Sequence, residues 1–214
     1  SLYALGYSPY YIYILFKRYA KDIISISNGP IVNGIGNYMI NKKLEIKGLK
    51  QGKELEDVFE EMARRKGIKK IQEIKKPLVV TTVDIQEIKK YVFTNDLANL
   101  NEEYYIDKIS VGKAVRATCS FPAIFCPCDF ENHKFLDGGV LDNIPVKEVK
   151  KQGASHVIAV NFEDDEINES SNIMDIAMHT INIMGNKISE KSSDKTTKIE
   201  KTNKASNKIV RHAK

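Results

Sequence analysis

The chain has 214 residues, of which 42% are hydrophobic, and its 33 lysines and arginines against 28 aspartates and glutamates give a formal net charge of +5. This length suits one domain with a buried core, and the composition is typical of a globular protein. The longest purely apolar and aromatic run, residues 10–16, is far shorter than the roughly 20 residues that a membrane-spanning helix needs, which excludes a transmembrane protein. Three cysteines cannot build a disulfide framework, and we expect a cytoplasmic protein.

The positive charge is concentrated at the C-terminal end of the chain. Residues 186–214 hold nine basic and three acidic side chains, a net charge of +6, which leaves −1 for residues 1–185. We therefore predict a globular domain over residues 1–185 and a lysine-rich solvated tail over residues 186–214. Because the body is nearly neutral and lacks a basic groove laced with aromatic side chains, we expect no nucleic-acid partner.

The first six residues are mostly apolar and end in Gly6, a pattern typical of the last turns of a helix. We interpret them as the end of a longer helix, and therefore as the continuation of a domain whose N-terminal part is missing; the alternative is a processed terminus with a short cap. Ser8 and Pro9 then suit the N-cap and first position of the next helix, and its apolar spacing predicts that most of that helix is buried. Residues 27–53 are rich in glycine and predict a loop-rich segment.

The following elements alternate between helices and strands. A helix is predicted after Lys53, with acids before bases, an apolar face and Gly67 at its end. Residues 78–83 predict a strand buried on both faces, with residues 88–93 as its neighbour. Ser110 suits the cap of a short helix that runs through Cys119, residues 156–162 predict a second buried strand, and Ser171 or Asn172 suits the cap of a last helix. This alternation indicates a layered α/β domain.

The most unusual segment is KFLDGGVLDNIP, residues 134–145. In this segment a short apolar run is followed by Asp137 and then by Gly138 and Gly139. Two successive glycines remove every Cβ next to the carboxylate, so another backbone or a substrate can approach it closely. An acid at the end of a strand with open space beside it is well placed to accept a proton, although Asp-Gly is also a common turn sequence.

The surrounding motifs carry a resemblance to a known family. The block AVRATCSFPAIFCP, residues 114–127, precedes the glycines, and NIPV (143–146) and GASHVIAV (153–160) follow them. Together they resemble the patatin-like phospholipase family in its bacterial form. The similarity runs through most of residues 1–180 and is sharpest from residue 110 to residue 162.

The resemblance implies a three-layer α/β/α domain and a serine acyl hydrolase with a Ser–Asp dyad, no histidine and no cofactor. In the family, the nucleophile lies in a Gly-x-Ser-x-Gly turn, and a separate glycine-rich loop forms the oxyanion hole. Only the acid carries over to this chain, as Asp137 with Gly138 and Gly139 completing its motif. Such a carboxylate, with a reference pKa near 3.9, is a weak base for a hydroxyl, so it must be close and desolvated.

The sequence departs from the family at the nucleophile. It contains no Gly-x-Ser-x-Gly and no glycine-rich oxyanion loop, and Gly153-Ala154-Ser155 lacks the closing glycine. In the family, the helix after the nucleophile runs into a stretch similar to residues 2–9. By that analogy the missing serine lies roughly six to eight residues before Ser1, in agreement with the interpretation of residues 1–6 as the end of a longer helix.

Other candidate residues are weaker. Ser155 and His156 are adjacent within a predicted strand, where their side chains would point to opposite faces. The four histidines are scattered along the chain, which also disfavours a Ser-His-Asp triad (His133, His156, His179, His212). Cys126 and Cys128 form a single Cys-x-Cys, short of the four ligands of a structural zinc site, so we expect small buried thiols and no metal.

Two charged residues near the motif leave alternatives open. Arg116 could neutralise a developing oxyanion or hold a loop in place, and the second role is favoured. Asp142 lies five residues after Asp137. Acids so spaced across a glycine turn more often face solvent, so we place it outside the dyad.

The function that the resemblance implies is hydrolysis of ester bonds in lipids, with a lipid or another acyl ester as the partner. We expect this chain alone to be inactive, because a base without a nucleophile has nothing to activate. The alternative is a non-catalytic protein: a degenerate fragment, or a module in which residues 186–214 bind anionic lipid headgroups, which adds a peripheral membrane contact to the cytoplasmic location.

Overall fold

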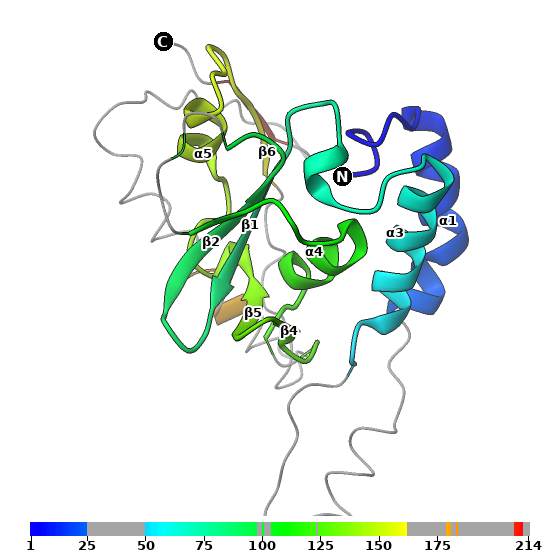
Figure 1. The fold of residues 1–214 in the computed structure, drawn as a ribbon, viewed down its shortest axis with the longest axis horizontal. Coiled ribbons are helices and arrows are strands. Elements are labelled where there is room, and N and C mark those ends of the chain that lie inside the picture. Colours follow the sequence, from blue (N-terminus) through cyan, green and yellow to red (C-terminus); the bar gives the residue numbers. More distant parts are fainter. Residues whose placement is uncertain are drawn as a thin grey trace, which may run out of the picture. The chain divides into compact units, whose positions relative to one another are not determined.

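A computed structural model describes residues 1–24, 50–97, 100, 104–122, 124–161, 179–180, 183 and 208–211 (Figure 1). The chain divides into two compact units, one of Ser1–Leu97 with Asn101–Asp137 and the other of Ala98–Leu100 with Gly138–Lys214. The predicted loop-rich segment lies outside the described residues apart from its last positions, as do most of the predicted last helix and most of the tail.

The first unit contains a five-stranded sheet with the order β3-β2-β1-β5-β4. Its strands are β1 (Val79–Asp84), β2 (Lys89–Thr94), β3 (Tyr105–Ile106), β4 (Cys128–Phe130) and β5 (His133–Asp137). The central strand β1 pairs antiparallel with β2 and with β5, β4 pairs antiparallel with β5, and β2 pairs parallel with β3. The prediction of a buried strand with a hairpin neighbour is confirmed, because the last four residues of β1 are buried.

Three helices lie in succession beside this sheet: α4 (Val111–Thr118) packs against β1 and β5, α3 (Lys53–Arg65) packs against α4, and α1 (Pro9–Ile24) packs against α3 (Figure 1). A short 3₁₀ helix, η1 (Ile71–Glu73), follows α3. Gly112 brings α3 and α4 close together, since a Cβ there would lie 2.3 Å from the carbonyl oxygen of Glu56. The core of the unit lies between these helices and the sheet, and its largest fully buried side chains are Phe93, Phe135, Met62, Ile71 and Ile109.

Residues 2–6 form a turn that closes at Gly6 as a helix end does, and the predicted end of α3 at Gly67 is confirmed. Gly6 has a φ of +86°, and the N–H groups of Gly6 and Tyr7 donate to the carbonyls of Tyr3 and Leu2, the two hydrogen bonds of a Schellman motif. Two residues later the hydroxyl of Ser8 accepts from the N–H of Tyr11 at 3.3 Å and so caps α1. Gly67 ends α3 in the same way, with a φ of +70°.

The prediction that most of α1 is buried is wrong. Leu15 is buried, whereas the side chains of Tyr10, Tyr13 and Phe16 are 75%, 60% and 53% exposed. The prediction took apolar spacing as a sign of burial, but α1 packs against α3, which covers only one side of it. None of the helices within the described ranges has the length and the apolar character needed to cross a membrane.

The second unit contains the 3₁₀ helix η2 (Gly138–Val140), α5 (Val146–Lys151), and an antiparallel pair formed by β6 (Ile158–Asn161) and β7 (Lys208–Arg211). The predicted strand at 156–162 therefore exists, but it is not buried on both faces. Ile158 and Val160 are 72% and 58% exposed, and Ala159 between them is buried.

Residues 208–211 also differ from the solvated tail predicted for 186–214. They form β7, because the β-branched Ile209 and Val210 suit a strand and the backbone of β6 supplies hydrogen-bonding partners. Helices combined with a mixed sheet make this an α/β fold, as the sequence predicts. The third layer of the predicted α/β/α arrangement stays a prediction.

Candidate active site

Asp137 is the last residue of β5, as the sequence predicts, and its side chain is half-buried. Its backbone N–H donates to the carbonyl oxygen of Ser120 at 3.1 Å, and it lies opposite Thr82 of β1 in the sheet. The chain continues directly into η2, in which the N–H groups of Leu141 and Asp142 both donate to the carbonyl of Gly138. A strand end, a helix end and a neighbouring strand thus fix the backbone at Asp137.

Three buried or half-buried hydroxyls tie these elements together. The hydroxyl of Thr82 donates, at 2.6 Å, to the backbone carbonyl of Leu136, the residue that precedes Asp137. The hydroxyl of Thr118, at the end of α4, donates to the backbone carbonyl of Thr81 at 2.8 Å, and the hydroxyl of Ser120 donates to the backbone carbonyl of Arg116 at 2.8 Å. The sequence alone did not identify these residues as part of the site. Its one relevant signal is that Thr82 and Asp84 lie two residues apart in a predicted strand and so share a face.

Cys119 lies in the electrostatic neighbourhood of Asp137. Burial raises the pKa of its thiol to about 11, and the negative charge of Asp137 adds to the rise. Cys119 is therefore a neutral thiol at physiological pH and a poor nucleophile. The amino group of Ser1 also interacts electrostatically with this thiol, so Ser1, Cys119 and Asp137 share one neighbourhood.

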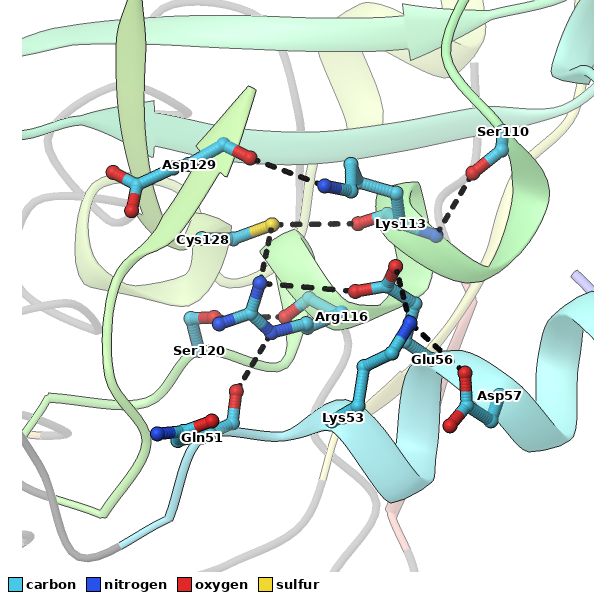
Figure 2. Close-up of polar contacts among 10 residues, drawn as sticks. All are labelled: Gln51, Lys53, Glu56, Asp57, Ser110, Lys113, Arg116, Ser120, Cys128 and Asp129. Carbon is cyan, nitrogen blue, oxygen red and sulfur yellow. Dashed lines mark hydrogen bonds and ion pairs between the residues drawn. The ribbon is translucent and has the colours of Figure 1, made fainter.

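Arg116 on α4 holds a loop, the role that the sequence favoured (Figure 2). Its Nε donates to the carbonyl oxygen of Gln51 at 2.7 Å, and its Nη1 lies 3.4 Å from the Sγ of Cys128 and 3.7 Å from Oε2 of Glu56. The guanidinium thus connects α4 with α3, with β4 and with the segment before α3. The Arg116 and Glu56 side chains are only 15% and 10% exposed, and these contacts define Arg116 as a structural residue.

The cysteines are free thiols, as expected. Cys128 is fully buried, and burial raises the pKa of its thiol, whereas Cys119 and Cys126 are half-buried. Among the residues that the structure describes, the group of side chains close enough to hold a metal ion contains no cysteine.

The prediction that Ser155 and His156 point to opposite faces is wrong. The Ser155 hydroxyl and Nδ1 of His156 lie 3.1 Å apart, because these residues form a bend before β6 rather than part of the strand. Both side chains are exposed, which denies the pair the desolvated surroundings of an activated nucleophile. Asp142 is half-buried just after the turn that follows the glycines, and its place outside the dyad stays a prediction.

Comparisons with known proteins bear on this site. The model of the family described as "Patatin-like phospholipase" matches residues 10–150. Lysophospholipase NTE1 of Candida albicans is 27% identical over 167 residues, which cover 75% of this chain and 10% of that protein.

Two further relatives are shorter proteins. The uncharacterized protein YqhO of Bacillus subtilis is 32% identical over 126 residues, or 56% of this chain and 42% of that protein. The probable lipid hydrolase 463L of Invertebrate iridescent virus 6 is 22% identical over 149 residues, or 68% of this chain and 47% of that protein. This chain therefore spans less than half the length of each of these three relatives.

Proposed function

Since this chain belongs to the patatin-like phospholipase family, we propose that it is part of a serine acyl hydrolase that cleaves ester bonds in lipids. The observation that carries this proposal is the position of Asp137. Its carboxylate is half-buried at the end of β5, its backbone is held by Ser120, and two residues without a Cβ follow it.

Asp137 acts in this proposal as the general base for a serine that precedes Ser1. It takes the hydroxyl proton as the serine Oγ attacks the ester carbonyl, and it returns that proton to the leaving alcohol as the acyl-enzyme forms. In the second half it takes a proton from water, whose oxygen attacks the acyl carbon, and the serine leaves with the proton as the fatty acid is released. General-base assistance of this kind contributes about 10²–10⁴-fold to the rate.

The surroundings of Asp137 support this role. Partial burial limits the hydration that would make the carboxylate a still weaker base, and the neighbouring Cys119 stays neutral, so it does not compete for the reaction. Lysophospholipids are the first substrates to test, because the Candida albicans relative is a lysophospholipase.

The test compares the 214-residue chain with the same chain extended upstream by the segment that its coding sequence specifies. We expect the extended protein to hydrolyse p-nitrophenyl esters and lysophosphatidylcholine, and the 214-residue chain to show no turnover above background. Turnover by the 214-residue chain that disappears on Asp137→Ala would contradict the proposal, because a serine within the chain would then serve. Asp129→Ala is the matched control, since Asp129 is an exposed carboxylate on the neighbouring strand β4.

A peripheral contact with the cytoplasmic surface of a membrane is the second part of the proposal. The exposed face of α1 carries Tyr10, Tyr13 and Phe16, together with the exposed Lys17 and Arg18. Aromatic side chains partition to the lipid–water interface, and basic side chains are attracted to anionic headgroups. This face, more than the tail of residues 186–214, is our candidate for the contact.

Co-sedimentation with phosphatidylserine-containing liposomes separates the two surfaces. We expect binding to fall on Tyr10→Ser combined with Tyr13→Ser, and to be largely kept when residues 186–214 are removed. Loss of binding only on removal of the tail would assign the contact to the tail, and would support the non-catalytic alternative if hydrolysis were also absent.

A further inference from the structure

Asp84, Glu87 and His133 form a cluster at the end of the hairpin between β1 and β2. Nδ1 of His133 lies 2.6 Å from Oδ2 of Asp84 and 3.9 Å from Oε1 of Glu87. One ligand atom from each of the three side chains lies within 4.8 Å of the others. Two carboxylates and an imidazole that meet in this way, from two separate parts of the chain, are a set of donors that divalent transition metals accept.

Two of the three side chains are held in place before any ligand arrives. Oδ1 of Asp84 accepts the backbone N–H groups of Gln86 at 2.6 Å and Glu87 at 3.0 Å, which leaves Oδ2 directed at His133. The His133 ring lies against Tyr91 and Phe135, with ring centroids 4.8 Å and 5.4 Å away. Orientation of the ligands by surrounding groups is what distinguishes a metal site from a chance meeting of polar side chains.

The surroundings of Glu87 complete the cluster. Oε2 of Glu87 accepts the hydroxyl of Tyr91 at 3.0 Å, so this phenol orients the second carboxylate. The Nζ of Lys89 lies 3.9 Å from the same oxygen and offsets one of the two negative charges.

An ion could reach the cluster from solvent. Glu87, Lys89, Tyr91 and Tyr104 line an open cavity of about 580 Å³. Asp84 is buried at the base of the turn, His133 is 22% exposed and Glu87 is 41% exposed. The ligands of one tetrahedral zinc ion lie about 3.3–3.5 Å apart, so Asp84 and His133 would separate slightly and the exposed Glu87 would move inwards.

From these contacts we propose that Asp84, Glu87 and His133 bind a divalent transition-metal ion, with zinc as the reference ion and water at the remaining position. On binding, the ion takes the place of any proton on Nδ1 of His133, and that proton is released to solvent. The bound ion connects the β1–β2 turn to the first residue of β5, the strand whose last residue is Asp137. Its role is to stabilise this part of the sheet, and the proposal does not depend on hydrolytic activity.

Calorimetric titration of the 214-residue chain with zinc chloride tests the proposal. We expect one ion per chain with a micromolar Kd, and a rise in Tm at saturating zinc. Glu87→Gln preserves the size of an exposed side chain and should fold, and we expect it to weaken binding roughly tenfold or more. His133→Gln should do the same, whereas His156→Gln, the matched change of an exposed histidine outside the cluster, should leave the Kd unchanged.

Cobalt(II) supplies an independent readout. We expect d–d absorption that is lost in Glu87→Gln, without the charge-transfer band that a thiolate ligand would add. A Kd weaker than millimolar, an unchanged Kd in Glu87→Gln, or a thiolate band that is lost on Cys126→Ser would each overturn the proposal.

Discussion

Asp84 and Asp137 end two paired strands, β1 and β5, and the groups around the two carboxylates differ. The side chain of Asp84 is 1% exposed and accepts hydrogen bonds from two backbone N–H groups and from His133. Asp137 is half-buried, its backbone N–H donates to the carbonyl of Ser120, and the hydroxyl of Thr82 donates to the carbonyl of the preceding Leu136.

Asp84 therefore acts as a structural residue, whereas Asp137 is a residue that the surrounding structure positions. The hydrogen bonds to Asp84 lower its pKa, and a carboxylate stabilised in its ionised form is a poor proton acceptor. At Asp137 the sheet and the end of α4 position the residue through its neighbours, and the two glycines after it leave room for an approaching group.

The largest expected effect is on catalysis. In the upstream-extended protein, we expect Asp137→Asn to lower kcat by about 10²–10⁴-fold, because the amide cannot accept the serine proton. Steady-state ester hydrolysis measures this, with Asp129→Asn as the control. If Asp129→Asn and Asp137→Asn lost activity equally, the contrast between Asp137 and other acids of the sheet would fail.

The next effect is on stability. Asp84→Ala leaves two backbone N–H groups and His133 without their acceptor, and we expect it to lower the free energy of unfolding by about 3–5 kcal/mol. We expect Asp137→Ala to cost less, because its side chain is half-buried whereas that of Asp84 is 1% exposed. Urea denaturation followed by circular dichroism gives both values, and a larger loss for Asp137→Ala would reverse the assigned roles.

A smaller effect is expected at Thr82. Thr82→Val keeps the shape of the side chain but removes the hydrogen bond to Leu136, which should cost about 1 kcal/mol of stability. In the extended protein, kcat should also fall, because the end of β5 is held less firmly. Unchanged kcat together with the expected loss of stability would show that Thr82 supports the fold but not the position of Asp137.

The last effect concerns pH. The lowered pKa of Asp84 means that its stabilising contribution is complete above the unfolded-state pKa, about 3.9, and is lost as the pH falls through the lower folded-state value. The stability difference between the wild-type chain and Asp84→Asn should therefore shrink as the pH falls below about 4. Urea denaturation over a pH series measures it, and a difference that grows on acidification would contradict the assignment.

Local signals predicted several of these elements from the sequence. Gly6 and Gly67 marked helix ends, Ser110 marked the start of α4, and the β-branched run at 78–83 marked the central strand. Each depends on interactions between residues close together in the chain. The prediction of Asp137 at a strand end is confirmed for the same reason, while its catalytic role stays a prediction.

Other features could not be predicted because they depend on tertiary packing. The exposure of α1 is set by which of its faces α3 covers, and apolar spacing alone does not report that. His133 and Asp84 are 49 residues apart and meet only through the register of β1 against β5. That register follows from packing of the whole sheet, so a single sequence showed an isolated histidine where the structure has a cluster.

Covalent labelling tests the central claim most directly. A fluorophosphonate reacts with an activated serine, and mass spectrometry of the digested protein identifies which serine carries the phosphonate. We expect label in the extended protein on a serine upstream of Ser1, more slowly in Asp137→Asn, and none on the 214-residue chain. Labelling of a serine within residues 1–214, or an unchanged rate in Asp137→Asn, would contradict the claim that Asp137 activates an upstream serine.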